Sequence, residues 1–323
     1  SLLKIPGLSI ISTGPGISKP SIRGLSGNRI VTYSNNMRFE NQQWGDEHGL
    51  EIDAFGTESI EVIKGPLSVL YGSDAIGGVI YISPDSYIND GFEVELGSYY
   101  NSNYSGFTNN LGIKGGSGKF SYIIQGSLVD NGDFENADGV VEGTFFESTD
   151  IKAGLGFNSE KFTSDLRFSH SSIKVGVPHG DEHDEDHHDE HGDDDDHDDD
   201  HDDDYDDDHD EDHDDHDGEG AHLAAELKNT SIDLKYLISS SDKTEFVFGS
   251  SLQFQDNINY GEEELLPDAS KNDFGLFGLA HFHGKVWDLM IGLRTDYRRI
   301  QKSQFDETYN SLTTSLGLKT DLG

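Results

Sequence analysis

Histidines and carboxylates, the side chains that bind metal ions, are concentrated in residues 179–222. This tract contains eleven His and twenty-seven Asp or Glu residues, and it has no Lys or Arg. Carboxylates alone suit calcium or magnesium, whereas imidazole at this density shifts the preference toward zinc, copper, nickel or iron. We expect zinc first among these. The candidate ligands are His179, His183, His187, His188, His191, His197, His201, His209, His213, His216 and His222.

The same tract offers almost nothing apolar to bury and its charges repel one another, which predicts a disordered, extended loop. Such a loop favours many weak, overlapping metal sites over one tetrahedral site. Without the tract the formal charge changes from −41 to −14, so the acidity is mainly a property of one segment. The alternative is a solvated acidic run that keeps surfaces apart, which eleven histidines make the less favoured interpretation.

A second candidate metal site is the run Asp46, Glu47 and His48, in a polar stretch between two expected strands. Two carboxylates beside an imidazole offer a discrete set of ligands. Three adjacent residues do not converge on one ion unaided, which favours the alternative that His48 closes a turn and the two acids are solvated. A residue of another element would have to complete the coordination of a metal here.

Composition excludes several classes of protein. The chain is 33% hydrophobic without a long apolar run, so we expect neither a transmembrane helix nor a signal peptide. Cysteine is absent, which excludes disulfides and thiolate metal sites and fits a cell-envelope protein. The negative charge opposes nucleic-acid binding. No nucleophile–base pair or closed catalytic metal pattern is evident, so we expect no enzyme and no required cofactor.

Alternating polarity from residue 92 onward predicts a membrane β-barrel. In the clearest segment, Trp287, Leu289, Ile291, Leu293 and Tyr297 point one way, and Asp288, Gly292, Arg294 and Asp296 point the other. One face then suits lipid and the other a wet lumen, because charged residues on the second face argue against a sandwich core. The stretch from Trp287 to Tyr297 projects to roughly 25 Å along the membrane normal, the distance between two aromatic girdles. Residues 120–128 and 246–255 alternate in the same way.

Short and long links alternate between these segments. Short links are expected near residues 115–118, 158–160, 239–243 and 283–285, and long links at residues 131–143, 179–222 and 256–272. Long links of outer-membrane barrels are extracellular, so we expect the acidic tract outside the cell. About ten strands precede residue 323, which predicts a portion of a larger barrel.

Three histidines of the expected barrel lie outside the tract. His281 and His283 fall on the lumen face of one strand, close to its short link, and we interpret them as ordinary wall residues. His170 lies near the outer end of its strand, just before the tract, and is a candidate for a site there.

The first ninety residues are glycine-rich, contain short apolar strands and predict a small globular α/β unit. Four motifs follow one another: Ile22-Arg23-Gly24, Ile60-Glu61-Val62-Ile63-Lys64-Gly65-Pro66, Val69-Leu70-Tyr71-Gly72 and Ala75-Ile76-Gly77-Gly78-Val79-Ile80. This series resembles the plug domain of TonB-dependent outer-membrane receptors. Later, Asn272-Asp273-Phe274-Gly275 and Gly292-Leu293-Arg294 resemble barrel segments of that family. We therefore expect a plug in residues 1–88, lacking its N-terminal part, and the N-terminal portion of the barrel in residues 89–323, about ten of roughly 22 strands.

The resemblance implies an active importer in the outer membrane of a Gram-negative bacterium, in contact with lipid and driven by the TonB-ExbB-ExbD complex. It also suggests that Arg23, Glu61 and Lys64 form buried ion pairs between plug and barrel wall. From the residues themselves, Gly77 and Gly78 are expected to let backbones pack closely before the strand that follows.

Three functions compete. The first is import of a metal ion, most directly zinc, captured by the His/Asp-rich tract. The second is import of a chelated ligand, a siderophore or haem, with the tract as an accessory. The third is a surface metal-binding or adhesion barrel, which the plug motifs disfavour. Residues 41–50 offer one Trp and no Lys or Arg, which favours a metal ion over a siderophore or haem.

Overall fold

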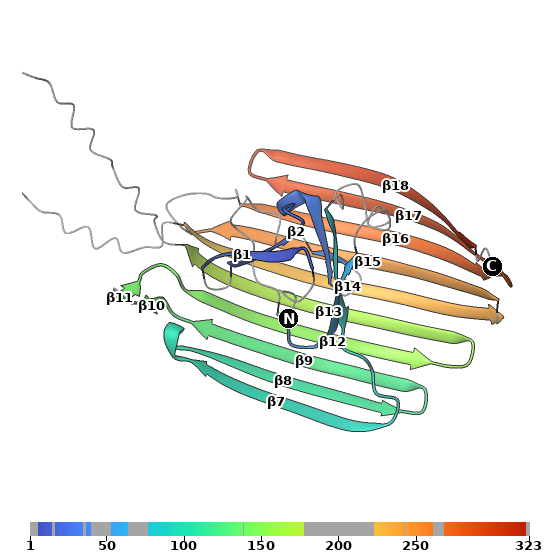
Figure 1. Ribbon diagram of the computed structural model, residues 1–323, viewed down its shortest axis with the longest axis horizontal. Helices are drawn as coiled ribbons and strands as arrows, with labels where there is room; N and C mark the ends of the chain where they lie inside the picture. The colour runs from blue at the N-terminus through green and yellow to red at the C-terminus, as the bar shows by residue number, and fades with distance from the viewer. Residues whose placement is uncertain are drawn as a thin grey trace, which may run out of the picture.

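The computed structural model describes residues 6–14, 17–34, 37–39, 53–63, 77–137, 139–177, 223–241, 243–260 and 268–320. These residues form strands, two short 3-10 turns and connecting links. Within these ranges, no helix is long and apolar enough to cross a membrane. The strands belong to small sheets near the N-terminus, to one large curved sheet and to a separate hairpin in residues 134–141 (Figure 1).

The N-terminal part contains a hairpin and a four-stranded sheet, which we call the small sheet. The hairpin pairs β1 (Leu8–Gly14) with β2 (Ile17–Ile22). The small sheet has the order β4-β3-β6-β5 and consists of β3 (Ile30–Ser34), β4 (Met37–Phe39), β5 (Thr57–Ile63) and β6 (Gly78–Pro84). Strands β3 and β6 run parallel, whereas β5 pairs antiparallel with β6. The start of β5 and the end of β6 therefore lie next to each other at one end of the small sheet.

Apolar residues of the predicted plug motifs form the core of this part. Ile22 and Ile80 pack with Leu8, Ile30 and Ile82 in one buried cluster. Gly78 has a φ of +136°, and a Cβ there would lie 2.9 Å from the carbonyl oxygen of Ile63. Any other residue would be strained and would collide with the neighbouring strand. The close approach expected from the double glycine is therefore confirmed.

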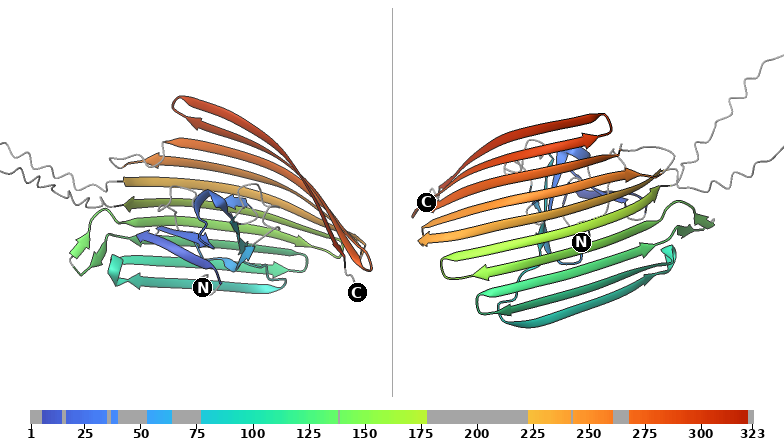
Figure 2. Two further views of the ribbon diagram at one scale, coloured as in Figure 1. Left: turned by 45° about the horizontal axis from the view of Figure 1, so that its top comes forward. Right: turned by 180° about the vertical axis from the view of Figure 1, so that it is seen from behind.

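The large sheet has ten antiparallel strands in the order β18-β17-β16-β15-β14-β13-β12-β9-β8-β7. They are β7 (Gly91–Asn101), β8 (Gly106–Ser117), β9 (Phe120–Asn131), β12 (Phe146–Asn158), β13 (Phe162–Val177), β14 (Leu223–Ser241), β15 (Thr244–Asn259), β16 (Ala269–His283), β17 (Trp287–Lys302) and β18 (Phe305–Thr320). A separate hairpin of β10 (Phe134–Asn136) and β11 (Gly139–Val141) joins β9 to β12. The sheet curves like part of a barrel wall, and the small sheet lies on its concave side (Figure 2). The boundary expected at residue 88 falls in the link between β6 and β7.

Cross-strand registers assign opposite polarities to the two faces of the curved sheet. One row of paired residues crosses seven strands of the concave face: Gln125, Lys152, Ser169, Ser231, Gln253, Asp273 and Arg298. At the adjacent position on each strand, the paired residues of the convex face are Ile124, Ala153, Phe168, Ile232, Leu252, Phe274 and Tyr297. A shift of one residue would exchange the faces, so the register is strongly specified.

The convex face exposes many large apolar residues, including Leu155 at 60%, Leu293 at 55% and Leu316 at 74%. Near the short turns it also carries a row of aromatic rings. Phe157 contacts Phe120 and Phe162 at ring-centroid distances of 5.0 and 6.0 Å, and Phe162 stacks on Tyr236 at 5.6 Å. An extended apolar band bounded by aromatics is the lipid-facing surface of a membrane barrel.

The two ends of the curved sheet differ in their connections. At one end β8 and β9, β12 and β13, β14 and β15, and β16 and β17 are joined by tight turns, which confirms the four predicted short links. At the opposite end β9 leads to β12 through the β10–β11 hairpin, and Val177 pairs with Leu223 where β13 ends and β14 begins. Strand β14 has 19 residues, more than the roughly 11 needed to span a bilayer, so strands project beyond the membrane.

Candidate functional site

The concave face contains buried polar side chains where it faces the small sheet. They include Gln125, Ser127, Ser148, Asp150, Asn229, Ser231, Asp233, Ser251, Gln253 and Lys271. Buried polar groups are costly unless they are hydrogen-bonded. Their partners therefore decide how the small sheet is held and what the surface around it can bind.

Lys152 on β12 binds the segment that leads into β5. Its Nζ lies 2.8 Å from Asp53 Oδ2 and donates to the backbone carbonyl oxygens of Asp53, at 3.2 Å, and of Phe55. The side chains of Lys152 and Asp53 are 20% and 12% exposed. One ammonium group from the wall thus satisfies three acceptors of a single loop, with its charge neutralised by the carboxylate.

Asp85 directly follows β6, at the same end of the small sheet. Its Oδ2 pairs with the ammonium of Lys114 on β8 and accepts a hydrogen bond of 3.0 Å from Gln125 Nε2 on β9. Gln125 also passes close to Gly56, whose φ is +74° and where a Cβ would overlap the Gln125 amide. Since Thr57 pairs with Pro84, Asp53 and Asp85 contact the wall from the same end of the small sheet.

Tyr87 makes the third contact between this end of the small sheet and the wall. Its hydroxyl donates to Asp165 Oδ1 at 2.6 Å, and the guanidinium of Arg167 lies 4.1 Å from its ring centroid. Arg167 also donates to Asp165 Oδ1 at 2.9 Å and to the carbonyl oxygen of Asp85 at 3.2 Å. The ring rests on Gly156, where a Cβ would lie 3.1 Å from it. The small residue on β12 therefore makes room for the ring.

The environment of Tyr87, outside the membrane-spanning strands, keeps its phenol protonated. Burial raises the pKa of Tyr87 strongly, and the hydrogen bond to the Asp165 carboxylate raises it further. A phenolate beside that carboxylate would also lose the hydrogen bond. The contact between link and wall consequently requires the protonated phenol.

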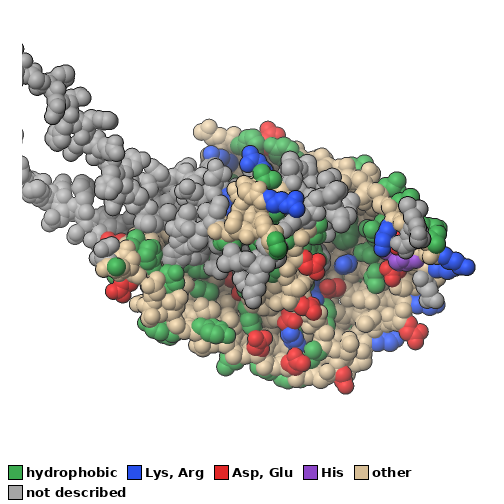
Figure 3. Space-filling model, viewed as in Figure 1, with side chains coloured by type: hydrophobic (Ala, Val, Ile, Leu, Met, Phe, Trp, Pro, Cys, Tyr) green, Lys and Arg blue, Asp and Glu red, His purple; other side chains and the backbone are tan. Residues whose placement is uncertain are grey.

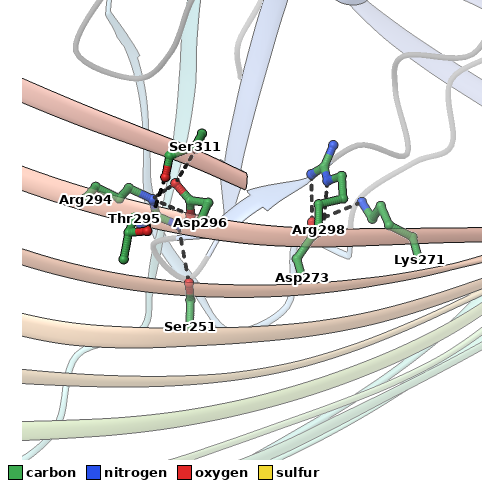
Figure 4. A network of polar contacts seen from close by, with 8 residues as sticks. All are labelled: Ser251, Lys271, Asp273, Arg294, Thr295, Asp296, Arg298 and Ser311. Atoms are coloured by element: carbon green, nitrogen blue, oxygen red, sulfur yellow. Dashed lines mark hydrogen bonds and ion pairs between the residues drawn. The ribbon is translucent and has the colours of Figure 1, made fainter. Parts of the chain in front are cut away.

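A second group of charges lies on the wall itself, across β15, β16 and β17 (Figure 4). Arg298 forms a bidentate pair with Asp273, with N···O distances of 2.8 and 2.7 Å, and Lys271 Nζ lies 3.7 Å from the same carboxylate. Arg294 donates to Asp296 at 2.8 Å and to Ser251 Oγ at 3.3 Å. Both carboxylates are paired with cations of the curved sheet itself, so these charges do not depend on the small sheet for their partners.

The contacts between the small sheet and the wall are of a kind that can be broken and re-formed. In the described residues, charges and hydrogen bonds at the loop and link beside β5 and β6 supply the specific contacts to β8, β9, β12 and β13. Polar contacts exchange for water at modest net cost, whereas packed apolar groups would expose hydrophobic surface on separation. Displacement of the small sheet would expose these polar groups to water on each side.

Most residues predicted as metal ligands fall outside the described residues. This applies to Asp46, Glu47 and His48 and to the eleven histidines of residues 179–222, so their roles stay predictions. His170 lies on the convex face, where its Nδ1 is 2.8 Å from Thr230 Oγ1.

The expectation that Arg23 and Glu61 form buried ion pairs with the barrel wall is wrong, because both residues are exposed. Arg23 instead occupies a tight turn with a φ of +52°, and its N–H donates to the carbonyl oxygen of Gly7 at 2.7 Å. Lys64 lies outside the described residues. The contacts to the wall are made by Asp53 and Asp85, which the motif comparison passed over.

Sequence reasoning also missed two other groups. Tyr87 and Arg167 carry no motif, and only their proximity in space reveals their role. Glu245, His281 and His283 have potential ligand atoms within 4.8 Å of one another. The available signal was the spacing of the two histidines on one strand face, with an acidic residue on the preceding strand.

Comparisons with known proteins agree with this architecture. The TonB-dependent Receptor Plug Domain model matches residues 1–79. The vitamin B12 transporter BtuB of Photobacterium profundum is 35% identical over 82 residues, which cover 25% of this chain and 14% of that protein. The heme/hemopexin utilization protein C of Haemophilus influenzae is 33% identical over 120 residues, 35% of this chain and 16% of that protein.

Among solved structures, the ferric citrate transporter FecA in its unliganded form superposes with a TM-score of 0.68 at 15% identity, covering 100% of this chain and 51% of that one. The chain thus spans about half of that structure, and its matched part is a small fraction of each curated relative. These proteins are receptors and transporters, not enzymes. Residues 1–79 therefore match the plug domain of TonB-dependent receptors, and the chain as a whole has the plug and β-barrel fold of such outer-membrane proteins of Gram-negative bacteria.

Proposed function

We propose that the protein imports a metal ion, most directly zinc, across the outer membrane. The observation that carries the import step is the small sheet held on the concave wall by polar contacts through Asp53, Asp85 and Tyr87. These contacts can be exchanged for water without exposing the apolar core of the small sheet. Their release opens a path along a polar wall.

Work on the small sheet is supplied by the TonB-ExbB-ExbD complex, as in the family that the plug sequence resembles. Asp53 and Asp85 flank β5 and β6, so a displacement of these strands strains the wall contacts first. Loss of the Lys152 and Lys114 pairs then leaves cations on the wall and carboxylates on the plug, each able to be hydrated.

Capture of the ion is assigned to the tract at residues 179–222. Its carboxylates concentrate cations near the mouth of the barrel, and its imidazoles hold borderline metals such as zinc. Asp46, Glu47 and His48 then provide the next candidate site on the way inward. The tract is thus the collecting part and the plug the gate.

A second candidate is import of a chelated metal. The names of two relatives favour it, since one is a vitamin B12 transporter and another a heme/hemopexin utilization protein. Under this proposal the acidic tract is an accessory, and the ligand is held by other groups. The two candidates differ in whether import depends on the imidazoles of the tract.

The experiment is zinc-65 uptake at nanomolar zinc by a zinc-starved strain that lacks its own receptor and expresses the full-length protein. Three forms are compared: the parent, a deletion of residues 179–222, and a matched variant in which the eleven histidines of the tract become Ser while every carboxylate is kept. We expect uptake to require the receptor and to fall in both altered forms.

If only the deletion reduced uptake, charge and not imidazole would be the capturing feature. If no zinc uptake depended on the receptor, while growth on haem or vitamin B12 did, the chelated-ligand candidate would replace the first. A receptor that supports neither kind of uptake would overturn both.

A further inference from the structure

The antiparallel register of β15, β16 and β17 brings four potential metal ligands to one place on the concave face. Glu245 stands opposite His281 across β15 and β16, and His283 stands opposite Asp288 across β16 and β17. His281 and His283 are two residues apart and so point to the same face. The cluster lies beside the tight turn between β16 and β17, and Figure 3 shows histidine next to acidic side chains at this end of the molecule.

Distances within the cluster are close to those that a single ion requires. The ligand atoms of Glu245, His281 and His283 lie within 4.8 Å of one another, and the two imidazole centroids are 3.9 Å apart. His283 Nε2 is 4.0 Å from Glu245 Oε2. Ligands at about 2.0–2.2 Å from zinc would need only side-chain rotations from this arrangement.

Asp288 has a different place in the cluster. Its Oδ1 lies 2.9 Å from His283 Nδ1, on the side of the ring away from the Glu245 contact at Nε2. A carboxylate that accepts a hydrogen bond from one imidazole nitrogen fixes the tautomer in which the other nitrogen offers its lone pair. Asp288 therefore orients His283 toward the position between Glu245 and His281.

We propose that Glu245, His281 and His283 bind one divalent transition-metal ion of the zinc class at the short-turn end of the barrel, with Asp288 as the positioning residue. Two imidazoles and one carboxylate match the three-ligand sets that zinc accepts, with a fourth position open. Two nitrogen ligands disfavour calcium and magnesium, which prefer oxygen.

The proposal does not depend on the proposed function, because an ion can bind here whether the imported ligand is a free metal or a chelate. Short links of outer-membrane barrels lie on the periplasmic side. The site is therefore at the inner end of the wall, at the end of the curved sheet opposite to where β13 ends and β14 begins. An ion crossing the barrel would meet it on leaving.

The test is residue-resolved footprinting of the full-length receptor in detergent. Diethylpyrocarbonate modifies accessible histidines, and mass spectrometry of the peptide with His281 and His283 follows modification as zinc is raised; the His283 side chain is 37% exposed and so open to the reagent. Because modification is assigned to each histidine, zinc binding by residues 179–222 does not mask the result. Magnesium replaces zinc in a parallel titration.

We expect zinc, and not magnesium, to protect His281 and His283 together with one midpoint. In Glu245→Gln and Asp288→Asn the midpoint should rise about 10- to 100-fold, as when a ligand or its supporting carboxylate is lost. His170, on the convex face, is the internal control and should stay unprotected. Circular dichroism verifies that each variant retains the β-sheet of the parent.

Equal modification of His281 and His283 with and without saturating zinc would overturn the proposal, as would an unchanged midpoint in both variants. Neither result would touch the proposed function, since protection of the histidines at residues 179–222 is read in the same spectra. Conversely, protection here with none in the tract would support the site while weakening the proposed role of the tract.

Discussion

The charged pairs of the concave wall fall into two regions that differ in where the partners come from. On β8, β12 and β13, Lys114, Lys152 and Arg167 bind acceptors of the loop and link beside the small sheet. On β16 and β17, Arg298 and Arg294 bind carboxylates of the wall itself. We call the first group the anchor contacts and the second the wall pairs.

The two groups identify which part of the wall depends on the plug for its charge partners. Anchor contacts satisfy polar groups of two separate bodies, so they are lost together when the small sheet moves. Wall pairs remain formed, because both partners lie within the curved sheet: Asp273 is opposite Arg298 on the neighbouring strand, and Arg294 and Asp296 are both on β17. The proposed import requires both properties: plug contacts that can be released, and a wall that stays folded when they are. Substitutions in the two regions test this division.

Lys152→Met should have the largest effect on plug docking. It leaves the Asp53 carboxylate and two carbonyl oxygens without their common donor. We expect docking to weaken by about 2–3 kcal/mol, less than for a fully buried pair because both side chains keep some exposure. Hydrogen exchange of β5 and β6 in the full-length receptor measures the loss.

The matched control is Lys174→Met on the adjacent strand. Lys174 pairs with Glu147 at 4.0 Å, and both side chains are about half exposed, so exchange in the small sheet should be unchanged. Equal effects of the two substitutions would show that Lys152 is not an anchor.

Gly156→Val should weaken docking by about 1–3 kcal/mol, since even a Cβ there reaches the ring of Tyr87 at 3.1 Å. The valine displaces the ring and breaks the hydrogen bond to Asp165. Gly126→Val is the control, because a Cβ at that position meets nothing closer than 3.8 Å. Protease cleavage in the link before β7 reports the displacement, and an intact link in Gly156→Val would contradict it.

Tyr87→Phe should cost about 1 kcal/mol, the net value of one hydrogen bond, while Asp165 keeps its bond from Arg167. The stacking surface for Arg167 is retained. The same exchange measurement on the small sheet should give a smaller change than Lys152→Met. A change as large as that of Lys152→Met would mean that the phenol has a partner beyond Asp165.

Alkaline pH should separate Tyr87 from the other anchor contacts. Because the pKa of Tyr87 is raised in the folded protein, its contribution is complete below about pH 10 and decreases as the pH rises further. Exchange in the small sheet should therefore accelerate above about pH 10 in the parent, with a weaker pH dependence in Tyr87→Phe. Identical pH profiles would remove Tyr87 from the anchor contacts.

Arg298→Gln should have the smallest effect on docking. Asp273 keeps Lys271 as a partner at 3.7 Å, and neither residue contacts the anchor residues in the interactions described above. We expect at most a local change in exchange on β16 and β17, and none in β5 or β6. Faster exchange in the small sheet of this variant would erase the distinction between the two regions.

Much of the barrel could be predicted because its strands have one wet and one lipid-facing side. Trp287, Leu293 and Tyr297 lie on the convex face and Arg294 and Asp296 on the concave one, as the alternation predicts. The plug was predicted from motif order, and Ile22 and Ile80 do form its core. The expected buried ion pairs of Arg23 and Glu61 with the barrel wall are not found, because motif resemblance identifies a segment but not the partner of each charge.

The amino-acid sequence was sufficient to predict which residues face lipid and where the short links fall, since period-two polarity and turn residues are local properties. The extended loop expected at residues 179–222 stays a prediction from charge density. Three contacts required the three-dimensional structure: Lys152 with Asp53, Tyr87 on Gly156, and Glu245 with His281 and His283. Each of these contacts depends on sheet register and on how the small sheet sits against the wall. Distances between residues that are far apart in the sequence cannot be inferred from any one segment of the chain.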